Sequence, residues 1–132
     1  MKHIKSFTIS FFLIHLLMIL IGAGCEKEEW EEIDLLPCEW QGEVIEIVTN
    51  YSGTIIKYPS TNAWVITGTV TGPPIKEFVF SPCNLPVEYQ KENLEIIFDG
   101  ELIDVQDWLE GNPQADFVGA PLNLTYAKIR IK

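Results

Sequence analysis

The stretch Leu94–Asp104, LEIIFDGELID, is the clearest strand signal in this sequence. Apolar and acidic side chains alternate along it, and the apolar positions are Leu94, Ile96, Phe98 and Leu102. Because successive residues of a strand point to opposite faces, this alternation predicts a strand with one buried face and one face in water. Gly100 lies in the apolar row, which favours a bulge or a bend there.

Shorter β-like runs surround this strand. Those before it are rich in β-branched and aromatic residues and cover residues 41–49, 54–58, 63–71 and 75–81. We expect turns between them at Asn50–Gly53 and Pro59–Asn62. The last run, Leu122–Ile131, changes its apolar phase along its length. Either both of its faces are covered near its start, or a bulge shifts the register around Thr125.

Only short helical segments fit between these runs. Asn84–Asn93 has helical spacing with Pro86 near its start, which predicts one or two helical turns. Val105–Pro121 holds two glycines and two prolines, which exclude a long helix. The pattern predicts an all-β fold, a small five- to six-stranded antiparallel OB-like Greek-key barrel with one short helical turn, if two early runs merge into one bent strand. A small antiparallel β-sandwich is the alternative.

Residues 1–24 have the pattern of an export signal. Basic residues precede an apolar run, Phe11–Ile21, and small residues stand directly before Cys25. This order is typical of a cleaved leader. The alternative is a transmembrane helix, for which the apolar run is short.

The residues around Cys25 resemble a lipid-attachment signal. Gly22-Ala23-Gly24-Cys25 resembles a bacterial lipobox, with Gly22 in place of the usual leucine. The next residues resemble the export signal of Bacteroidetes-type surface lipoproteins, and they are Glu26, Lys27, Glu28 and Glu29. The resemblance implies that Cys25 is acylated and that a lipid anchor holds the chain at the outer membrane, with its orientation there left open.

The remaining chain divides into a lipidated acidic tether, 25–37, and a single OB-like β domain, 38–132. Residues 26–34 hold six acids and one lysine, and like charges in a block repel one another and stay solvated. An acidic binding segment around Trp30 is the alternative. Cys38 and Cys83 are an even pair in an exported domain, so we expect a disulfide between them, with two reduced buried thiols as the alternative.

The segment 84–102, NLPVEYQKENLEIIFDGEL, is followed by a final basic strand. Together they resemble small OB-like lipoproteins of the Bacteroidetes, including the NigD-like group. The resemblance is concentrated in Asn84-Leu85-Pro86 and Phe98-Asp99-Gly100. It implies an OB-type domain and transfers no catalytic residue to this chain.

The composition excludes several functions. Both histidines, His3 and His15, lie in the expected leader, so the mature chain has no Ser–His–Asp or Cys–His arrangement. The net charge of −10 disfavours a nucleic-acid partner. The acids lack calcium-loop spacing, and two cysteines without histidine do not supply a structural zinc site. We therefore expect no enzyme activity, no cofactor and no metal.

Aromatic side chains are the remaining candidates for a site. OB-type domains bind ligands on a strand face and with the loops joining strands 1–2 and 4–5, which we assign to Thr49–Gly53 and Val105–Pro121. The candidate binding residues are Tyr51, Trp64, Asp107, Trp108 and Phe117. Core packing is the alternative for Trp64 and Phe117.

We therefore expect a non-catalytic binding or accessory module that meets the membrane through its lipid and takes a protein or glycan ligand. The alternatives are a carbohydrate-binding surface lipoprotein and a structural envelope protein.

Overall fold

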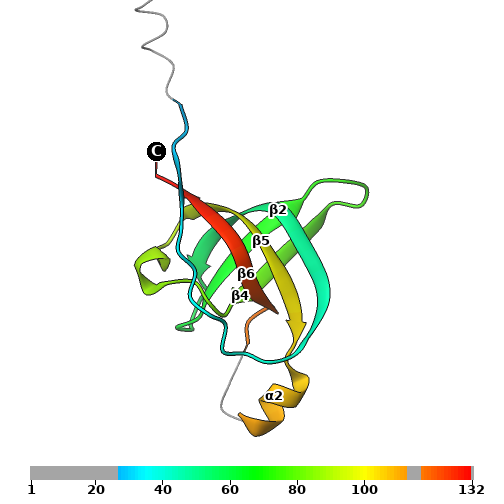
Figure 1. Ribbon diagram of the computed structural model, residues 1–132. Helices are drawn as coiled ribbons and strands as arrows, with labels where there is room; N and C mark the ends of the chain where they lie inside the picture. Colours follow the sequence, from blue (N-terminus) through cyan, green and yellow to red (C-terminus); the bar gives the residue numbers. More distant parts are fainter. Residues whose placement is uncertain (1–26, 113–116, 132) are drawn as a thin grey trace, which may run out of the picture.

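The computed structural model describes residues 27–112 and 117–131, and its main feature is a β-barrel (Figure 1). Its strands are β1 (Trp30–Glu32), β2 (Glu43–Lys57), β3 (Trp64–Val70), β4 (Lys76–Pro82), β5 (Leu94–Asp104) and β6 (Ala120–Arg130). A single 3₁₀ turn, η1 (Val87–Tyr89), precedes β5, and a short helix, α2 (Gln106–Gly111), follows it. The expected leader, Cys25 and Glu26 lie outside the described residues. Among the described residues, no helix is long and apolar enough to span a bilayer.

The strands close into a ring. In the order β2, β3, β4, β6, β5, each strand pairs with the next, and β5 pairs back with β2. The parallel pair is β4 and β6, so the sheet is mixed, whereas the sequence analysis predicted an antiparallel one. The ring and its single short helical turn before the last two strands confirm the predicted small all-β barrel.

β2 joins two runs that the sequence analysis separated. It pairs with β5 along most of its length and with β3 only over Thr54–Lys57. Asn50 has φ 55°, and the pairing with β5 shifts register between Val48 and Tyr51. The prediction of a turn at Asn50–Gly53 is therefore wrong, because these residues form a bulge within one bent strand. The connection between the first two barrel strands is residues 58–63 instead.

Two glycines let β2 and β3 cross closely. A Cβ atom on Gly68 would lie 2.6 Å from the backbone oxygen of Ser52, and one on Gly53 would lie 2.9 Å from that of Thr67. Side chains at either position would push the strands apart. The crossing brings the middle of β2 against β3 just before the two strands diverge.

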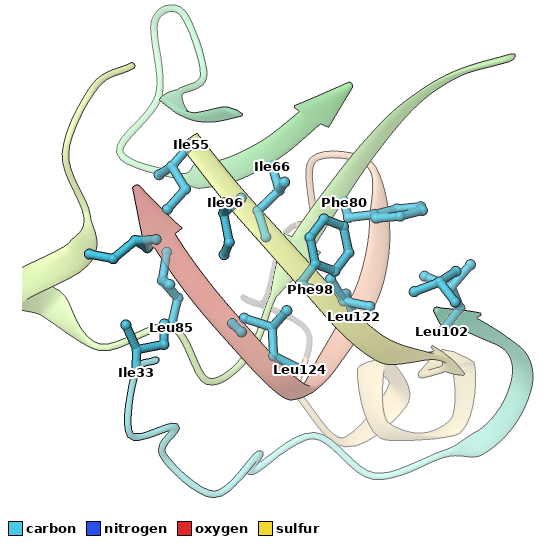
Figure 2. Packing of buried hydrophobic residues seen from close by; sticks show 13 residues of the cluster. Ile33, Ile55, Ile66, Phe80, Leu85, Ile96, Phe98, Leu102, Leu122 and Leu124 are labelled. Carbon is cyan, nitrogen blue, oxygen red and sulfur yellow. The ribbon is translucent and has the colours of Figure 1, made fainter. Parts of the chain in front are cut away.

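Aliphatic side chains and two phenylalanines fill the barrel (Figure 2). In β5 the alternation holds as predicted, with Ile96, Phe98 and Leu102 buried. Burying a side chain of this size stabilises the fold by about 1.5–3 kcal/mol. Asp99 of β5 pairs with Tyr126 of β6, and the next residue, Gly100, pairs with Leu124. The pairing therefore skips Thr125, which confirms the bulge that was one of the two alternatives for this strand.

The acidic N-terminal segment lies against the barrel, which differs from the tether prediction. β1 pairs with the end of β6, and Ile33 belongs to the core with 4% of its surface exposed. The Lys128 ammonium lies 5.8 Å from the centre of the Trp30 ring, a cation–π contact. The apolar residues thus fix a segment whose acids face water, and its strand begins at Trp30.

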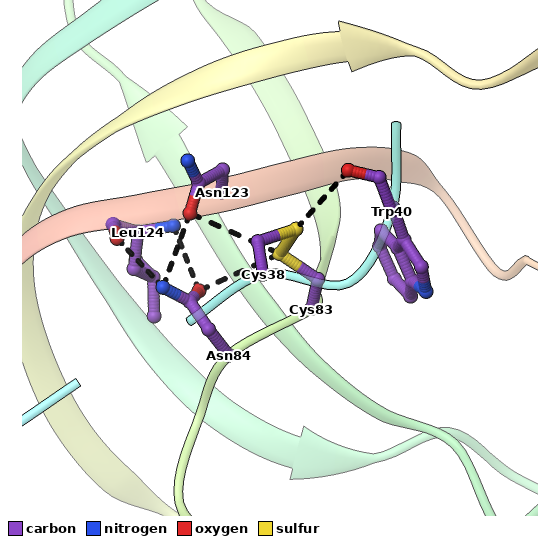
Figure 3. Close-up of a disulfide and its surroundings, with 6 residues drawn as sticks. All are labelled: Cys38, Trp40, Cys83, Asn84, Asn123 and Leu124. Carbon is purple, nitrogen blue, oxygen red and sulfur yellow. Dashed lines mark hydrogen bonds between the residues drawn. A yellow bond between two sulfur atoms is a disulfide. The ribbon is translucent and has the colours of Figure 1, made fainter. Parts of the chain in front are cut away.

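A disulfide between Cys38 and Cys83 fastens the next part of the chain to the end of β4, as predicted (Figure 3). Beside it, the buried Asn84 side chain bridges to β6. Its Nδ2 donates to the Leu124 carbonyl at 2.8 Å, and its Oδ1 accepts from the Leu124 N–H at 2.9 Å. These contacts hold the linker between β4 and η1 in place.

Candidate functional site

The predicted binding residues fall in different parts of the molecule. Tyr51 lies in the middle of β2, and Trp64 is at the start of β3, half-buried and packed against the core. Asp107 and Trp108 lie in α2, and Phe117 precedes β6. In the described part of the chain no ring contact joins Tyr51 to the rings near α2. The ring contacts therefore bring Trp108 and Phe117 together but leave Tyr51 with a different group of rings.

The rings near α2 form a packing cluster at one end of the barrel. Phe117 lies edge-on to Trp40, with ring centres 4.4 Å apart. Trp108 lies 6.1 Å from Phe117 and 6.3 Å from Trp40. All three side chains are half-buried. The cluster holds α2 against the segment after Cys38, so Trp108 packs here, while Asp107 is exposed.

Tyr51 lines a slot in the wall of the barrel. The last pair between β2 and β3 is Thr54 with Thr67, and beyond the close approach of the Ser52 carbonyl to Gly68 the two strands no longer pair. The resulting cavity of about 410 Å³, which we call the slot, is lined by Thr49, Asn50, Tyr51, Ser52, Thr69, Val70, Thr71 and Phe78. Its size lies at the small end of ligand pockets.

The floor of the slot is aromatic and continues into the core. The rings of Tyr51 and Phe78 are 5.5 Å apart, and both side chains are half-buried. Tyr51 also lies 6.0 Å from Phe98, while Phe78 stacks on Phe80 at 4.6 Å. These contacts hold the floor rigid, so a ligand would meet an ordered apolar surface.

The rim of the slot is polar and neutral. It carries hydroxyl groups from Ser and Thr side chains and the amide of Asn50, all of which both donate and accept hydrogen bonds. The Asn50 backbone N–H donates a hydrogen bond to Oδ1 of Asp99 at 2.6 Å. This bond fixes the β2 bulge that forms one side of the slot.

A shallow groove of about 550 Å³ crosses the outer face of the barrel beside the slot and shares Ser52 and Thr69 with it. At its other side the Arg130 guanidinium bonds Glu95 at 2.7 Å and lies 3.5 Å from Glu28. The hydrogen bond that Arg130 donates to Glu95 and the negative charge of Glu28 raise the pKa of Arg130. Since this cation is engaged by carboxylates, the groove offers little attraction to an anion.

A third cavity, of about 420 Å³, lies at the hairpin Tyr58–Asn62 that joins β2 to β3. This hairpin takes the place that the sequence analysis gave to Thr49–Gly53. Glu92 accepts a hydrogen bond from the Lys57 N–H at 3.0 Å beneath it. The lining is polar and has no large apolar floor, so the slot is the better candidate site.

Sequence reasoning missed Phe78 and Thr69–Thr71. The signal for Phe78 was its alternation with Phe80 in IKEFVFS, which puts both rings on one strand face. The signal for the rim was the threonine-rich end of β3. Neither pattern reveals that β2 and β3 separate at this point, because that depends on the long-range pairing of β2 with β5.

The described residues contain no group of three or more His, Cys, Asp or Glu side chains placed to hold a metal ion. The chain matches no family model and no curated protein. The fold and the slot thus define it as a small all-β barrel with an aromatic opening in its side.

Proposed function

We propose that this protein is a non-catalytic binding module, lipid-anchored at Cys25 in the outer membrane, and that the slot is its binding site. The observation that carries the proposal is the aromatic floor of Tyr51 and Phe78, reached from outside between two diverging strands. An ordered apolar surface with a polar rim is the usual composition of a ligand site.

The chemistry of the lining supports binding over catalysis. The side chains around the slot are hydroxyl, amide, aliphatic and aromatic groups. General acid–base catalysis uses groups that titrate near the working pH, such as histidine or a carboxylate with a shifted pKa. The slot lining offers hydrogen bonds and apolar contact instead.

The placement of the barrel supports a role close to the membrane. The Ile131 backbone N–H donates a hydrogen bond to the Glu29 carbonyl, so the chain is held on the barrel from Glu29 onward, four residues after Cys25. Four extended residues span at most about 14 Å. A lipid on Cys25 would thus hold the barrel near the headgroups, with little freedom to reach distant partners.

Site-specific photocrosslinking on living cells tests this function. A photoreactive residue replaces Thr71 at the slot, and the matched control replaces Val87, which is exposed in η1. We expect a discrete crosslinked species from position 71 that is absent from position 87. The same products from both positions, or none from position 71, would contradict a binding role for the slot.

A glycan is the second candidate ligand, and the hydroxyl-rich rim over an aromatic floor favours it. Binding of the full-length chain to a glycan array, lost in Tyr51→Ala and kept in Tyr126→Ala, would support this candidate. Absence of signal above background would remove it.

A further inference from the structure

The first two-thirds of β2 forms backbone hydrogen bonds to a neighbouring strand along only one of its two edges. Between Glu43 and Ser52 the strand pairs with β5, and within residues 27–112 and 117–131 no strand pairs with its other edge. Backbone N–H and C=O groups along such an edge form a ready template for another strand. This free edge faces β3 and ends where the Ser52 carbonyl approaches Gly68. Its last residues, Thr49–Ser52, also line the slot.

The free edge carries exposed apolar side chains. Val44, Ile45 and Ile47 are 48%, 66% and 71% exposed. An exposed edge strand rich in β-branched residues is normally covered, or it associates with another chain. The two bulges of β2, at Ile45 and near Asn50, bend the strand but pair no other strand with its free edge.

The charge around this edge is acidic. Glu43 lies opposite Asp104, and Ile47 lies opposite Glu101 on β5. Neither β2 before Lys57 nor β5 contains a lysine or an arginine. Like charges directly opposite one another destabilise a strand pair, so a cationic partner would relieve a repulsion that is already present.

The other side of the slot, formed by β3 with β4 behind it, carries one positive and one negative charge. Lys76 lies opposite Val70, and Glu77 lies opposite Thr69. The acids of β2 and β5 therefore set the sign of the potential. A second copy of this chain, which has a net charge of −10, would bring a second acidic edge beside this one. Charge complementarity thus favours a basic partner over self-association.

We propose that the free edge of β2 binds an extended, basic segment of a partner protein by strand addition, and that one apolar side chain of this segment enters the slot. This inference rests on the proposed binding function and names its partner class. The ladder supplies the main-chain hydrogen bonds, while the slot and the acids select the side chains. The segment Glu43–Ser52 spans about 34 Å as a strand, so a peptide of about ten residues matches it.

Peptide binding by the full-length chain, purified in detergent, tests this proposal. The probe is a fluorescent peptide of about ten residues in which lysine and valine alternate around a central phenylalanine. One control replaces each lysine with glutamate. The other keeps all side chains but carries N-methyl groups on alternate backbone amides, which removes ladder donors and leaves the charge unchanged.

We expect the basic peptide to bind at least about tenfold more tightly than either control. Glu43→Lys with Glu46→Lys should reduce binding about tenfold, whereas Glu88→Lys with Glu110→Lys, a matched change of exposed acids elsewhere, should not. Thr71→Trp should also weaken binding, because its indole fills the slot from an exposed rim position. Circular dichroism confirms that each variant keeps its strands.

Equal binding of the basic and N-methylated peptides, or no binding of either, would overturn strand addition. If the species crosslinked at position 71 in cells is a glycan or a lipid, strand addition fails while the binding function stands. If position 71 crosslinks nothing, both fail. A crosslinked protein whose attached segment is extended and basic, together with the peptide preference, supports both.

Discussion

The Asp99 carboxylate accepts a hydrogen bond from the Asn50 backbone N–H at 2.6 Å, and this contact joins the bulge of β2 to the middle of β5. Asn50 stands at φ 55°, a left-handed conformation that asparagine tolerates better than most residues. The contact satisfies a backbone donor that the bulge removes from regular pairing. It thereby keeps β2 continuous past the slot, where a turn would otherwise form.

Removal of the Asp99 acceptor should loosen the bulge. We expect Asp99→Ala to lower the free energy of unfolding by about 1 kcal/mol, and Asp99→Asn, which keeps a side-chain oxygen, to lower it less. Urea unfolding followed by circular dichroism measures both. Equal losses of unfolding free energy in the two variants would contradict a stabilising role for the side-chain oxygen at position 99.

Position 50 should be sensitive to backbone preference. Asn50→Gly should leave stability almost unchanged, because glycine adopts positive φ readily. Asn50→Val should cost about 1–2 kcal/mol, because a β-branched side chain is strained in the left-handed region. The same unfolding measurements compare the two variants, and a valine variant as stable as the glycine variant would contradict the left-handed bulge.

Loss of the disulfide should destabilise the barrel substantially. Cys38→Ser with Cys83→Ser opens a loop that joins residues 45 apart in the sequence. The chain-entropy relation gives a loss of roughly 4 kcal/mol as an upper value. Urea midpoints of the oxidised protein, the reduced protein and the double variant measure it. The reduced protein and the variant should agree, and no change in either would contradict a structural role.

Alkaline titration should reveal how the acidic segment lies on the barrel. Burial, followed by the charges of Glu88, Glu31 and Asp34, raises the pKa of Tyr89. Because its folded pKa exceeds the unfolded value of about 10, stability from neutral Tyr89 is complete below pH 10 and is lost as the pH rises through the folded pKa.

Ultraviolet titration of tyrosinate should therefore show a late-ionising component that Tyr89→Phe removes. Glu31→Gln with Asp34→Asn should shift it to lower pH, whereas Glu43→Gln with Glu77→Gln should leave it in place. An unchanged titration in the first pair would place the acidic segment away from Tyr89.

Lipid attachment should depend on a single side chain. We expect the full-length chain to incorporate a labelled fatty acid in the cells that make it, and Cys25→Ser to abolish the label. Detergent partitioning of both proteins provides the second measurement. Label retained in the Cys25→Ser variant would contradict the proposed anchor.

The features that the sequence could predict were those set by the alternation of residues along a strand or by the chemistry of a residue pair. The burial of β5, the bulge at Thr125 and the pairing of Cys38 with Cys83 follow from spacing or from chemical pairing. The turn at Asn50–Gly53 was wrong because pairing with β5 and the contact from Asp99 override the local turn preference.

Composition misled in the N-terminal segment. Its acids predict a solvated tether, yet Trp30, Ile33 and Leu35 give it an apolar side that packs on the barrel. The aromatic residues posed a related problem, since a sequence does not distinguish a packed ring from a ligand platform. Trp108 packs near α2, whereas Tyr51 meets Phe78, a residue that sequence analysis did not select.

Backbone hydrogen exchange of the full-length chain, with and without the basic peptide, tests the role of the free edge most directly. We expect the peptide to slow exchange of amides in Glu43–Ser52 and at Thr69–Thr71, and to leave α2 and η1 unchanged. Binding that protects α2 while Glu43–Ser52 exchanges as before would contradict this site.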